Sequence, residues 1–249
     1  MRSQIKSSIK QLYQTLKNIG QPKFQCPICG YHGAFLDVSP ITGVRKFARC
    51  PQCGLGERHR IQKLVLDQLF NTYNPSQSKI LHFAPEAFFS NYFKQRFHEY
   101  ISADLCMPNV DVQCDITDLP FRDGEFNFVY GSHVLEHVQD DLKALCEIKR
   151  ILTPDGIAIL PVPIVSEKTI EYPEPNPLET DHVRAPGKDY FERYSQFFSR
   201  VEQYSSSDFP EKYQTFLYED RSKYPNEASP LRQPCYGQKH DDIVPVCFL

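Results

Sequence analysis

The chain has 249 residues, 41% of them hydrophobic and 24% charged, which is typical of a globular protein with one ordinary domain and a small module. No apolar run approaches the length of a membrane span, and the first residues lack the apolar stretch of a signal peptide. Nine cysteines, an odd number, argue against a disulfide framework. We therefore expect no membrane span and a cytoplasmic location.

The net charge of −3 conceals a division along the chain. Residues 1–60 contain ten Lys or Arg and only two acidic residues, so the remainder of the chain is strongly acidic. The positive charge of this module is consistent with three interpretations: it binds a polyanion such as RNA, it contacts the acidic face of the neighbouring domain, or it is a solvated surface.

The first predicted element is an amphipathic helix. Apolar side chains recur at helical spacing over residues 3–19, and Gly20 is a natural end for the helix. We assign residues 1–22 to this element.

Two matching knuckles follow, in a segment that we assign as a zinc ribbon over 23–56. Cys26-Pro-Ile-Cys29-Gly and Cys50-Pro-Gln-Cys53-Gly give the spacing C-x2-C-x20-C-x2-C. Four thiolates at this spacing predict a tetrahedral zinc site. Iron in a rubredoxin-like site and a pair of disulfides are the rival interpretations.

Residues 57–78 are predicted to link the ribbon to the main domain through a helix over 57–72. From residue 79, strands and helices alternate, as expected for βαβ units over a mostly parallel sheet. The predicted strands are 79–84, 100–104, 110–115, 126–131, 157–162, 201–206 and 242–249, and the predicted helices are 86–97, 139–152 and 187–198.

Residues 161–187 contain six prolines, too many for a helix or a central strand. We predict an irregular lid here. It follows the carboxyl end of a strand, where open α/β sheets bind ligands.

Several segments, taken together, resemble a known family. KILHFAPE, YISAD, QCDITDLPF, FNFVYGSHVLEHV and LKALCEIKRILTPDGIAILPVP occur in that order between residues 79 and 206. The series resembles a class I S-adenosylmethionine-dependent methyltransferase of the type 11 group. Together with the ribbon, the segments ERHR at 57–60 and DHVR at 181–184 resemble a subgroup of zinc-ribbon methyltransferases.

The resemblance implies a Rossmann-like, seven-stranded, mostly parallel sheet with helices on both faces over 79–249, and S-adenosylmethionine as cofactor. Asp104 ends the second strand, where an acid can accept both ribose hydroxyls of a nucleoside. By resemblance, Asp115 accepts the adenine amino group, with the Ile116 backbone beside it.

The family's glycine-rich first loop is replaced here by a stretch without glycine. His82, Ala84 and Glu86 lie at this position, and Glu86 is a candidate partner for the cofactor's amino group or the first residue of the next helix. Ser132, after the fourth strand, completes the predicted cofactor residues.

Methyl transfer requires mainly positioning, and a base only if the acceptor must lose a proton. The candidates are His182 and Asp181 in the lid and His133 after the fourth strand, with Glu136 and His137 nearby. Any of these histidines could instead be structural.

The sequence does not distinguish between a small molecule, a glycan and RNA as the methyl acceptor. Residues 130–133, Tyr-Gly-Ser-His, lack the Asn/Asp-Pro-Pro-aromatic motif of amino methylation on DNA bases. The alternative is a non-catalytic module that binds nucleic acid or protein on a degenerate methyltransferase fold, and the glycine-free loop favours it.

Overall fold

The computed structural model describes residues 20–39, 43–220, 222 and 236–249, so the helix predicted over 3–19 lies outside the described residues. Within these ranges the α-helices are α2 (Glu57–Leu69), α3 (Ala87–Lys94), α4 (Asp141–Ile151) and α5 (Phe191–Tyr194). The strands are β1 (Phe24–Gln25), β2 (His32–Gly33), β3 (Leu36–Val38), β4 (Val44–Arg49), β5 (Lys79–Phe83), β6 (Glu99–Asp104), β7 (Val112–Gln113), β8 (Phe126–Gly131), β9 (Leu152–Ile159), β10 (Ile170–Asn176), β11 (His182–Ala185), β12 (Arg200–Ser205), β13 (Leu217–Asp220), β14 (Tyr236–His240) and β15 (Ile243–Phe248).

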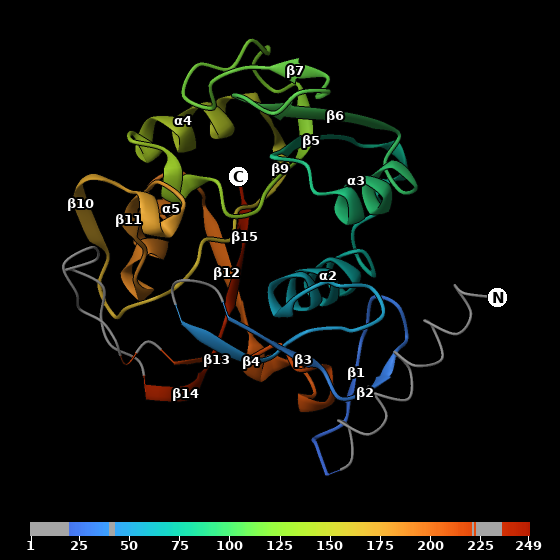
Figure 1. Ribbon diagram of the computed structural model, residues 1–249. Coiled ribbons are helices and arrows are strands. Elements are labelled where there is room, and N and C mark those ends of the chain that lie inside the picture. Colours follow the sequence, from blue (N-terminus) through green and yellow to red (C-terminus); the bar gives the residue numbers. More distant parts are fainter. Residues whose placement is uncertain (1–19, 40–42, 221, 223–235) are drawn as a thin grey trace.

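A seven-stranded sheet forms the centre of the molecule (Figure 1). Its order is β12-β15-β9-β8-β5-β6-β7, and β15 runs antiparallel to both of its neighbours, while β9, β8, β5, β6 and β7 are mutually parallel. The chain order reverses between β5 and β8, which is the switch point where open α/β sheets bind ligands. The predicted Rossmann-like α/β fold is confirmed.

Successive side chains of a strand point to opposite sides of the sheet, and helices pack against the apolar side chains on each side. On β5, Leu81 and Phe83 join a core with α4, whereas Ile80 joins a second core with α2 and α3. That second core is rich in aromatic rings from α3, including Phe89 and Phe93. The helix expected to link two domains, α2, thus buries Ile61, Val65 and Leu66 against the main sheet.

The cysteine-rich module is joined to the far end of the chain. Its strands β3 and β4 form a four-stranded sheet with β13 and β14, in the order β14-β13-β4-β3. The buried side chain of Arg60 strengthens this junction, because its guanidinium donates to the carbonyls of Ala48 and Gln214 and lies over the ring of Phe35. The predicted boundary between residues 1–56 and the main domain is therefore crossed by a shared sheet.

The predicted lid is not irregular, contrary to expectation. Strands β10 and β11 within it form an antiparallel hairpin, with a bulge where prolines interrupt the pairing between Glu171 and Asn176. The hairpin tolerates its prolines because it is a separate two-stranded sheet, so each strand has one unpaired edge. In Figure 1 it lies to the left, beside α5.

Three further elements differ in extent from the prediction. The third strand is only two residues long, the helix expected over 187–198 is shortened to α5 after a 3-10 turn, and β9 begins directly after α4 rather than at residue 157. Among the described residues, no helix has the length and apolar character needed to cross a membrane.

Candidate active site

A cavity of about 520 Å³ opens at the carboxyl ends of β5, β6 and β8, and we call it the cofactor cavity. Its apolar walls include Phe83, Leu105 and Ile116, and its polar side chains include Asp104 and Asp115. It lies at the switch point of the sheet. An apolar cavity with a few converging polar groups at this place is the usual form of a small-molecule site.

Asp104 ends β6 with its carboxylate fixed at the cavity. Its Oδ1 accepts hydrogen bonds from the backbone N–H groups of Cys106 and Met107, at 2.8 and 2.7 Å. Both bonds use the same oxygen, so Oδ2 remains available to a ligand.

Ala84 and Asp115 also line the cavity. Ala84 adopts a left-handed conformation with φ of 45°, a region that favours glycine, and its N–H donates to Ala103 O at 3.0 Å. The loop therefore takes a glycine-like path without a glycine. Asp115 accepts hydrogen bonds from the backbone and hydroxyl of Thr117, which lower the pKa of its carboxyl.

Two predicted cofactor residues, His82 and Ser132, do not line the cofactor cavity. His82 points to the opposite face of the sheet, where its Nδ1 lies 3.0 Å from the Tyr100 hydroxyl; burial lowers its pKa to about 3. The Ser132 hydroxyl accepts a hydrogen bond from Gln62 of α2.

Glu86 faces α2 instead of the cavity. Its Oε1 lies 2.5 Å from Arg58 Nη2 and 3.2 Å from His59 Nε2. Burial raises the pKa of the Glu86 carboxyl, but His59 and Arg58 together outweigh burial and bring it to about 2. Glu86 thus stays ionised as the partner of α2.

A second cavity of about 250 Å³, which we call the hairpin cavity, adjoins the first. The hairpin contributes Glu179, Thr180 and His182 to its lining, and the carboxyl-terminal region contributes Asp242. His133 lines both cavities. Its N–H donates to Pro161 O, and its φ is 57°, so a strained loop after β8 holds it at the boundary.

Three histidines and one glutamate meet at the boundary between the cofactor cavity and the hairpin cavity. We call them the His/Glu cluster: His133, Glu136, His137 and His182. Oε1 of the fully buried Glu136 lies 3.3 Å from His133 Nδ1 and 4.0 Å from His182 Nε2. The rings of His137 and His182 are nearly perpendicular, with centroids 4.6 Å apart. The structure thus brings together two of the three predicted catalytic residues, whereas Asp181 is exposed and does not line the cavity.

Arg184 fixes the hairpin to the segment that carries Glu136 and His137. Its buried guanidinium donates to the carbonyls of Leu135, Val138 and Gln139 and also pairs with Glu171. Thr180 and Asp181, both left-handed with φ near 60°, then turn the chain into His182. The cluster is therefore preorganised by contacts between residues far apart in the sequence.

Burial is the largest single influence on the pKa values of His182, Glu136 and Asp242, although at Glu136 other groups outweigh it. It lowers the pKa of His182, so that the ring is neutral near pH 7. Burial also raises the pKa of Glu136, but His133 and His182 outweigh it and keep the carboxyl ionised. Burial raises the pKa of Asp242 to about 6.

The four predicted metal ligands converge as expected of one site. The sulfurs of Cys26 and Cys53 are 3.8 Å apart and those of Cys29 and Cys50 are 3.6 Å apart, and all four lie within 4.8 Å of one another. Zn–S bonds of about 2.3 Å in a tetrahedron would separate sulfurs by about 3.8 Å, whereas a disulfide needs about 2.05 Å. Gly30 and Gly54, both with φ of 76°, close the two knuckles in the same way. The donor set fits a tetrahedral ion.

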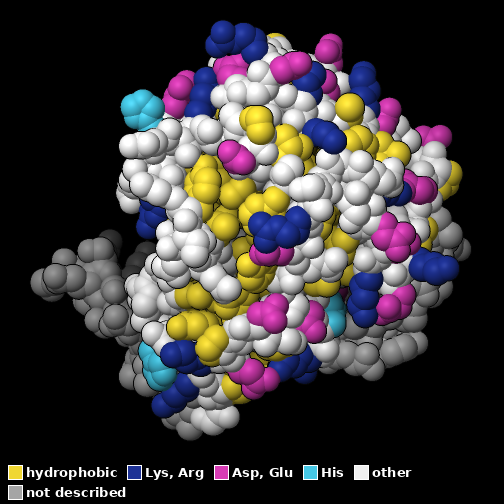
Figure 2. Space-filling model, turned by 180° about the vertical axis from the view of Figure 1, so that it is seen from behind, with side chains coloured by type: hydrophobic (Ala, Val, Ile, Leu, Met, Phe, Trp, Pro, Cys, Tyr) yellow, Lys and Arg dark blue, Asp and Glu magenta, His cyan; other side chains and the backbone are white. Residues whose placement is uncertain are grey.

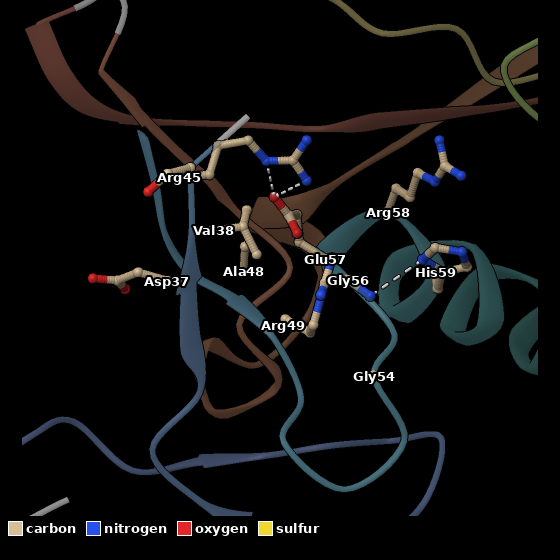
Figure 3. A pocket seen from close by; sticks show the side chains of 11 residues that line it. Asp37, Val38, Arg45, Ala48, Arg49, Gly54, Gly56, Glu57, Arg58 and His59 are labelled. Carbon is tan, nitrogen blue, oxygen red and sulfur yellow. Dashed lines mark hydrogen bonds and ion pairs between the residues drawn. The ribbon is translucent and has the colours of Figure 1, made fainter. Parts of the chain in front are cut away.

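A third cavity of about 580 Å³ lies between this module and α2 (Figure 3). Arg45 pairs with Glu57 there, and the Gly56 N–H donates to His59 Nδ1. Arg45, Arg58 and Arg60 thus all have partners within the molecule. The face in Figure 2 mixes acidic and basic side chains without a field of one sign. Neither observation favours a polyanion.

Comparison with known proteins agrees with this description. Residues 85–160 match the family model Methyltransf_11, described as a methyltransferase domain. A stretch of 69 residues is 38% identical to an uncharacterized 37.1 kDa protein in transposon Tn4556 of Streptomyces fradiae; it covers 27% of this chain and 20% of that protein. The chain therefore spans only about a fifth of this curated relative.

Two solved structures share the fold. One is 1,6-didemethyltoxoflavin-N1-methyltransferase of Burkholderia thailandensis with bound 1,6-didemethyltoxoflavin and S-adenosylhomocysteine, 16% identical with a TM-score of 0.52, covering 77% of each chain. The other is an S-adenosylmethionine-dependent methyltransferase of Mesorhizobium loti, 12% identical with a TM-score of 0.52, covering 78% of this chain and 100% of that one. The family match supports a methyltransferase domain within residues 85–160, and the two solved structures support the predicted fold.

Sequence reasoning did not identify three residues of this region. Leu105 lines the cofactor cavity while 60% exposed, Asp242 lines the hairpin cavity from just before β15, and Arg184 fixes the hairpin. Leu105 carried a signal, because it directly follows the acid at the end of β6. Arg184 was named only within the segment DHVR and without this role, and the position of Asp242 depends on tertiary packing alone.

Proposed function

We propose that S-adenosylmethionine binds in the cofactor cavity, with Asp104 on the ribose and Asp115 and Ile116 beside the adenine. The acceptor then occupies the hairpin cavity. One observation carries this proposal: His133 lines both cavities, so a group in one can reach a group in the other. The cofactor, when bound, supplies an activated methyl group on a sulfonium sulfur.

The residues around the boundary would position the acceptor and exclude water. In the transfer they would serve, the methyl carbon would exchange its bond to sulfur for one to the acceptor, and the electron pair of the broken bond would stay on sulfur. If the acceptor atom carries a proton, His133 is the base nearest to both cavities, and Asp242 with its raised pKa is a second candidate. Asp181 is too exposed to be favoured for this role.

For the cysteine site we propose a structural zinc ion. Four thiolates form a closed donor set without an open position, which is typical of structural rather than catalytic zinc. The shared sheet and Arg60 then fix the module to the main domain. A small molecule or glycan is favoured over RNA as the acceptor, because Arg45 and Arg58, which line the hairpin cavity, are already paired with Glu57 and Glu86.

Calorimetric titration with S-adenosylhomocysteine tests the cofactor site. Asp104→Asn is expected to weaken binding about 10- to 100-fold, since a charge-assisted hydrogen bond is worth about 1.5–3 kcal/mol. Asp118→Asn, a neighbouring exposed acid outside the cavity, is the matched control and should leave binding unchanged. Absence of binding by folded, metal-replete protein would contradict the proposal and favour the non-catalytic alternative.

A further inference from the structure

The His/Glu cluster contains a charge that the described residues do not neutralise by hydrogen bonding. Glu136 is 0% exposed, and among the described residues its carboxylate has only the 3.3 Å contact of Oε1 with His133 Nδ1, which does not have hydrogen-bond geometry, while Oε2 has no hydrogen-bond partner. Burying an ionised carboxylate without a partner is costly, and native proteins place a cation or a donor beside such a group. The groups that face it are imidazole rings, which are ligands as well as donors.

The arrangement around Glu136 has the composition of a metal site. One ligand atom each from Glu136, His137 and His182 lies within 4.8 Å of the other two. Two imidazoles and one carboxylate are the ligands of catalytic zinc sites and of non-haem iron sites. Bonds of about 2.0–2.1 Å would place ligand atoms roughly 3.4 Å apart, so small side-chain rotations would complete the geometry.

A further carboxylate stands behind one of the rings. His182 Nε2 faces Glu136 at 4.0 Å, while its Nδ1 lies 3.9 Å from Glu179 Oε2. Histidines that ligate metals usually have a carboxylate or carbonyl at the second ring nitrogen, which fixes the ring and raises its basicity. Arg184 supports the same geometry, because it fixes β11 to the segment of Glu136 and His137.

We propose that Glu136, His137 and His182 bind a divalent transition-metal ion at the boundary between the two cavities. Three protein ligands leave a coordination position open, unlike the four cysteines. His137 lines the cofactor cavity and His182 lines the hairpin cavity, so the open position faces the place where the two ligands meet. This inference rests on the proposed function and adds an acceptor class to it. The acceptor is a molecule that receives the methyl group on an oxygen atom and binds the ion through that same oxygen.

Cobalt(II) tests the site in the full-length protein as purified, with the cysteine site already filled. Titration is expected to show one equivalent of tight binding, with the visible d–d absorption of nitrogen and oxygen ligands and without strong thiolate charge transfer. Glu136→Gln and His182→Ala should each weaken binding at least 30-fold. His98→Ala removes an exposed histidine from another part of the surface and should change nothing.

Each variant is also titrated with S-adenosylhomocysteine, because Glu136 and His182 lie outside the cofactor cavity. Retained affinity shows that a loss of cobalt binding does not reflect unfolding. Cobalt binding by a protein that fails to bind S-adenosylhomocysteine would support the metal site and contradict the proposed function. Unchanged cobalt affinity in Glu136→Gln, or no binding by the parent protein, would overturn the metal site.

Acetohydroxamate, a chelator with two oxygen donors, probes the open position. Its addition should shift the cobalt spectrum of the parent protein and of His98→Ala. An unchanged spectrum would show that the ion has no position for an acceptor oxygen and would overturn that part of the inference.

Discussion

The described part of the chain contains two groups of side chains that can hold a metal ion, and they are built in opposite ways. Cys26, Cys29, Cys50 and Cys53 come from two short knuckles, each held by its own glycine turn. The His/Glu cluster joins residues 133–137 to residue 182, and a buried arginine holds the two parts together. The first group is a product of local chain geometry, and the second is a product of the tertiary fold.

The difference has a functional meaning. The cysteine group is enclosed by the module's own small core, which includes Phe35, and offers four ligands. The cluster offers fewer ligands and borders two cavities. A closed group of this kind stabilises structure, whereas an open one can participate in chemistry. Substitutions in the two groups should therefore change different properties.

The largest effect on stability is expected from Cys50→Ser. Cys50 is fully buried, and loss of one thiolate should release the metal and destabilise the module by at least about 4 kcal/mol. Unfolding should extend to β13, which pairs with β4. Metal analysis and thermal unfolding measure the effect, and Cys106→Ser, at an exposed thiol, is the control. Full metal content in Cys50→Ser would refute a four-cysteine site.

Arg184→Met should have the next largest effect, of about 2–4 kcal/mol, because it leaves one buried and two partly buried carbonyls without their donor. Denaturant unfolding measures this loss. Cobalt affinity should fall as well, since the hairpin is freed from the segment of Glu136, while S-adenosylhomocysteine affinity should persist. Arg122→Met, at a side chain that is 90% exposed, is the control. Normal stability and cobalt affinity would show that the cluster does not depend on this arginine.

Asp242→Asn tests how much the buried carboxylate of Asp242, which lines the hairpin cavity, destabilises the folded protein when it is ionised. The folded-state pKa of about 6 exceeds the usual 3.8, so the native state binds this proton more tightly than the unfolded state. The contribution of Asp242 to the free energy of unfolding is therefore greatest below pH 4, and it falls by about 2–3 kcal/mol as the pH rises from there through 6. Unfolding curves of the asparagine variant should lack this fall. An identical pH dependence in both proteins would mean that Asp242 is not the titrating group.

The smallest effect is expected from Ala84→Gly, which tests whether the glycine-free loop departs functionally from the family pattern. Relief of the left-handed conformation, about 1 kcal/mol, is offset by the greater freedom of glycine in the unfolded chain. Stability should change by less than about 1 kcal/mol, and calorimetry should show unchanged S-adenosylhomocysteine affinity. A large gain in affinity would indicate that Ala84 obstructs the cofactor.

The same contrast explains what could be predicted from the sequence. The strand that ends at Asp104, the alternation of strands and helices, and the cysteine knuckles all follow from local spacing and periodicity. The hairpin in residues 161–187 was missed because its proline content masks short strands that pair only with each other. The sheet shared by β4 and β13 joins segments about 170 residues apart, for which a single sequence carries no local signal.

Side-chain direction was the other source of error. His82 and Phe83 are neighbours on β5, yet the alternation of the strand sends one ring toward α3 and the other toward the cofactor cavity. Glu86 was predicted either to pair with the cofactor or to begin the next helix; it is the N-cap residue of α3, and its carboxylate pairs with Arg58 and His59 of α2. Because α2 was interpreted as a linker, its side chains were not considered as partners.

A crystal structure with S-adenosylhomocysteine tests the central claim most directly. We expect the ribose on Asp104, the adenine beside Asp115 and Ile116, and the sulfur directed toward His133 and the hairpin cavity. A ligand bound elsewhere, or one whose sulfur points away from His133, would contradict methyl transfer at the boundary between the two cavities.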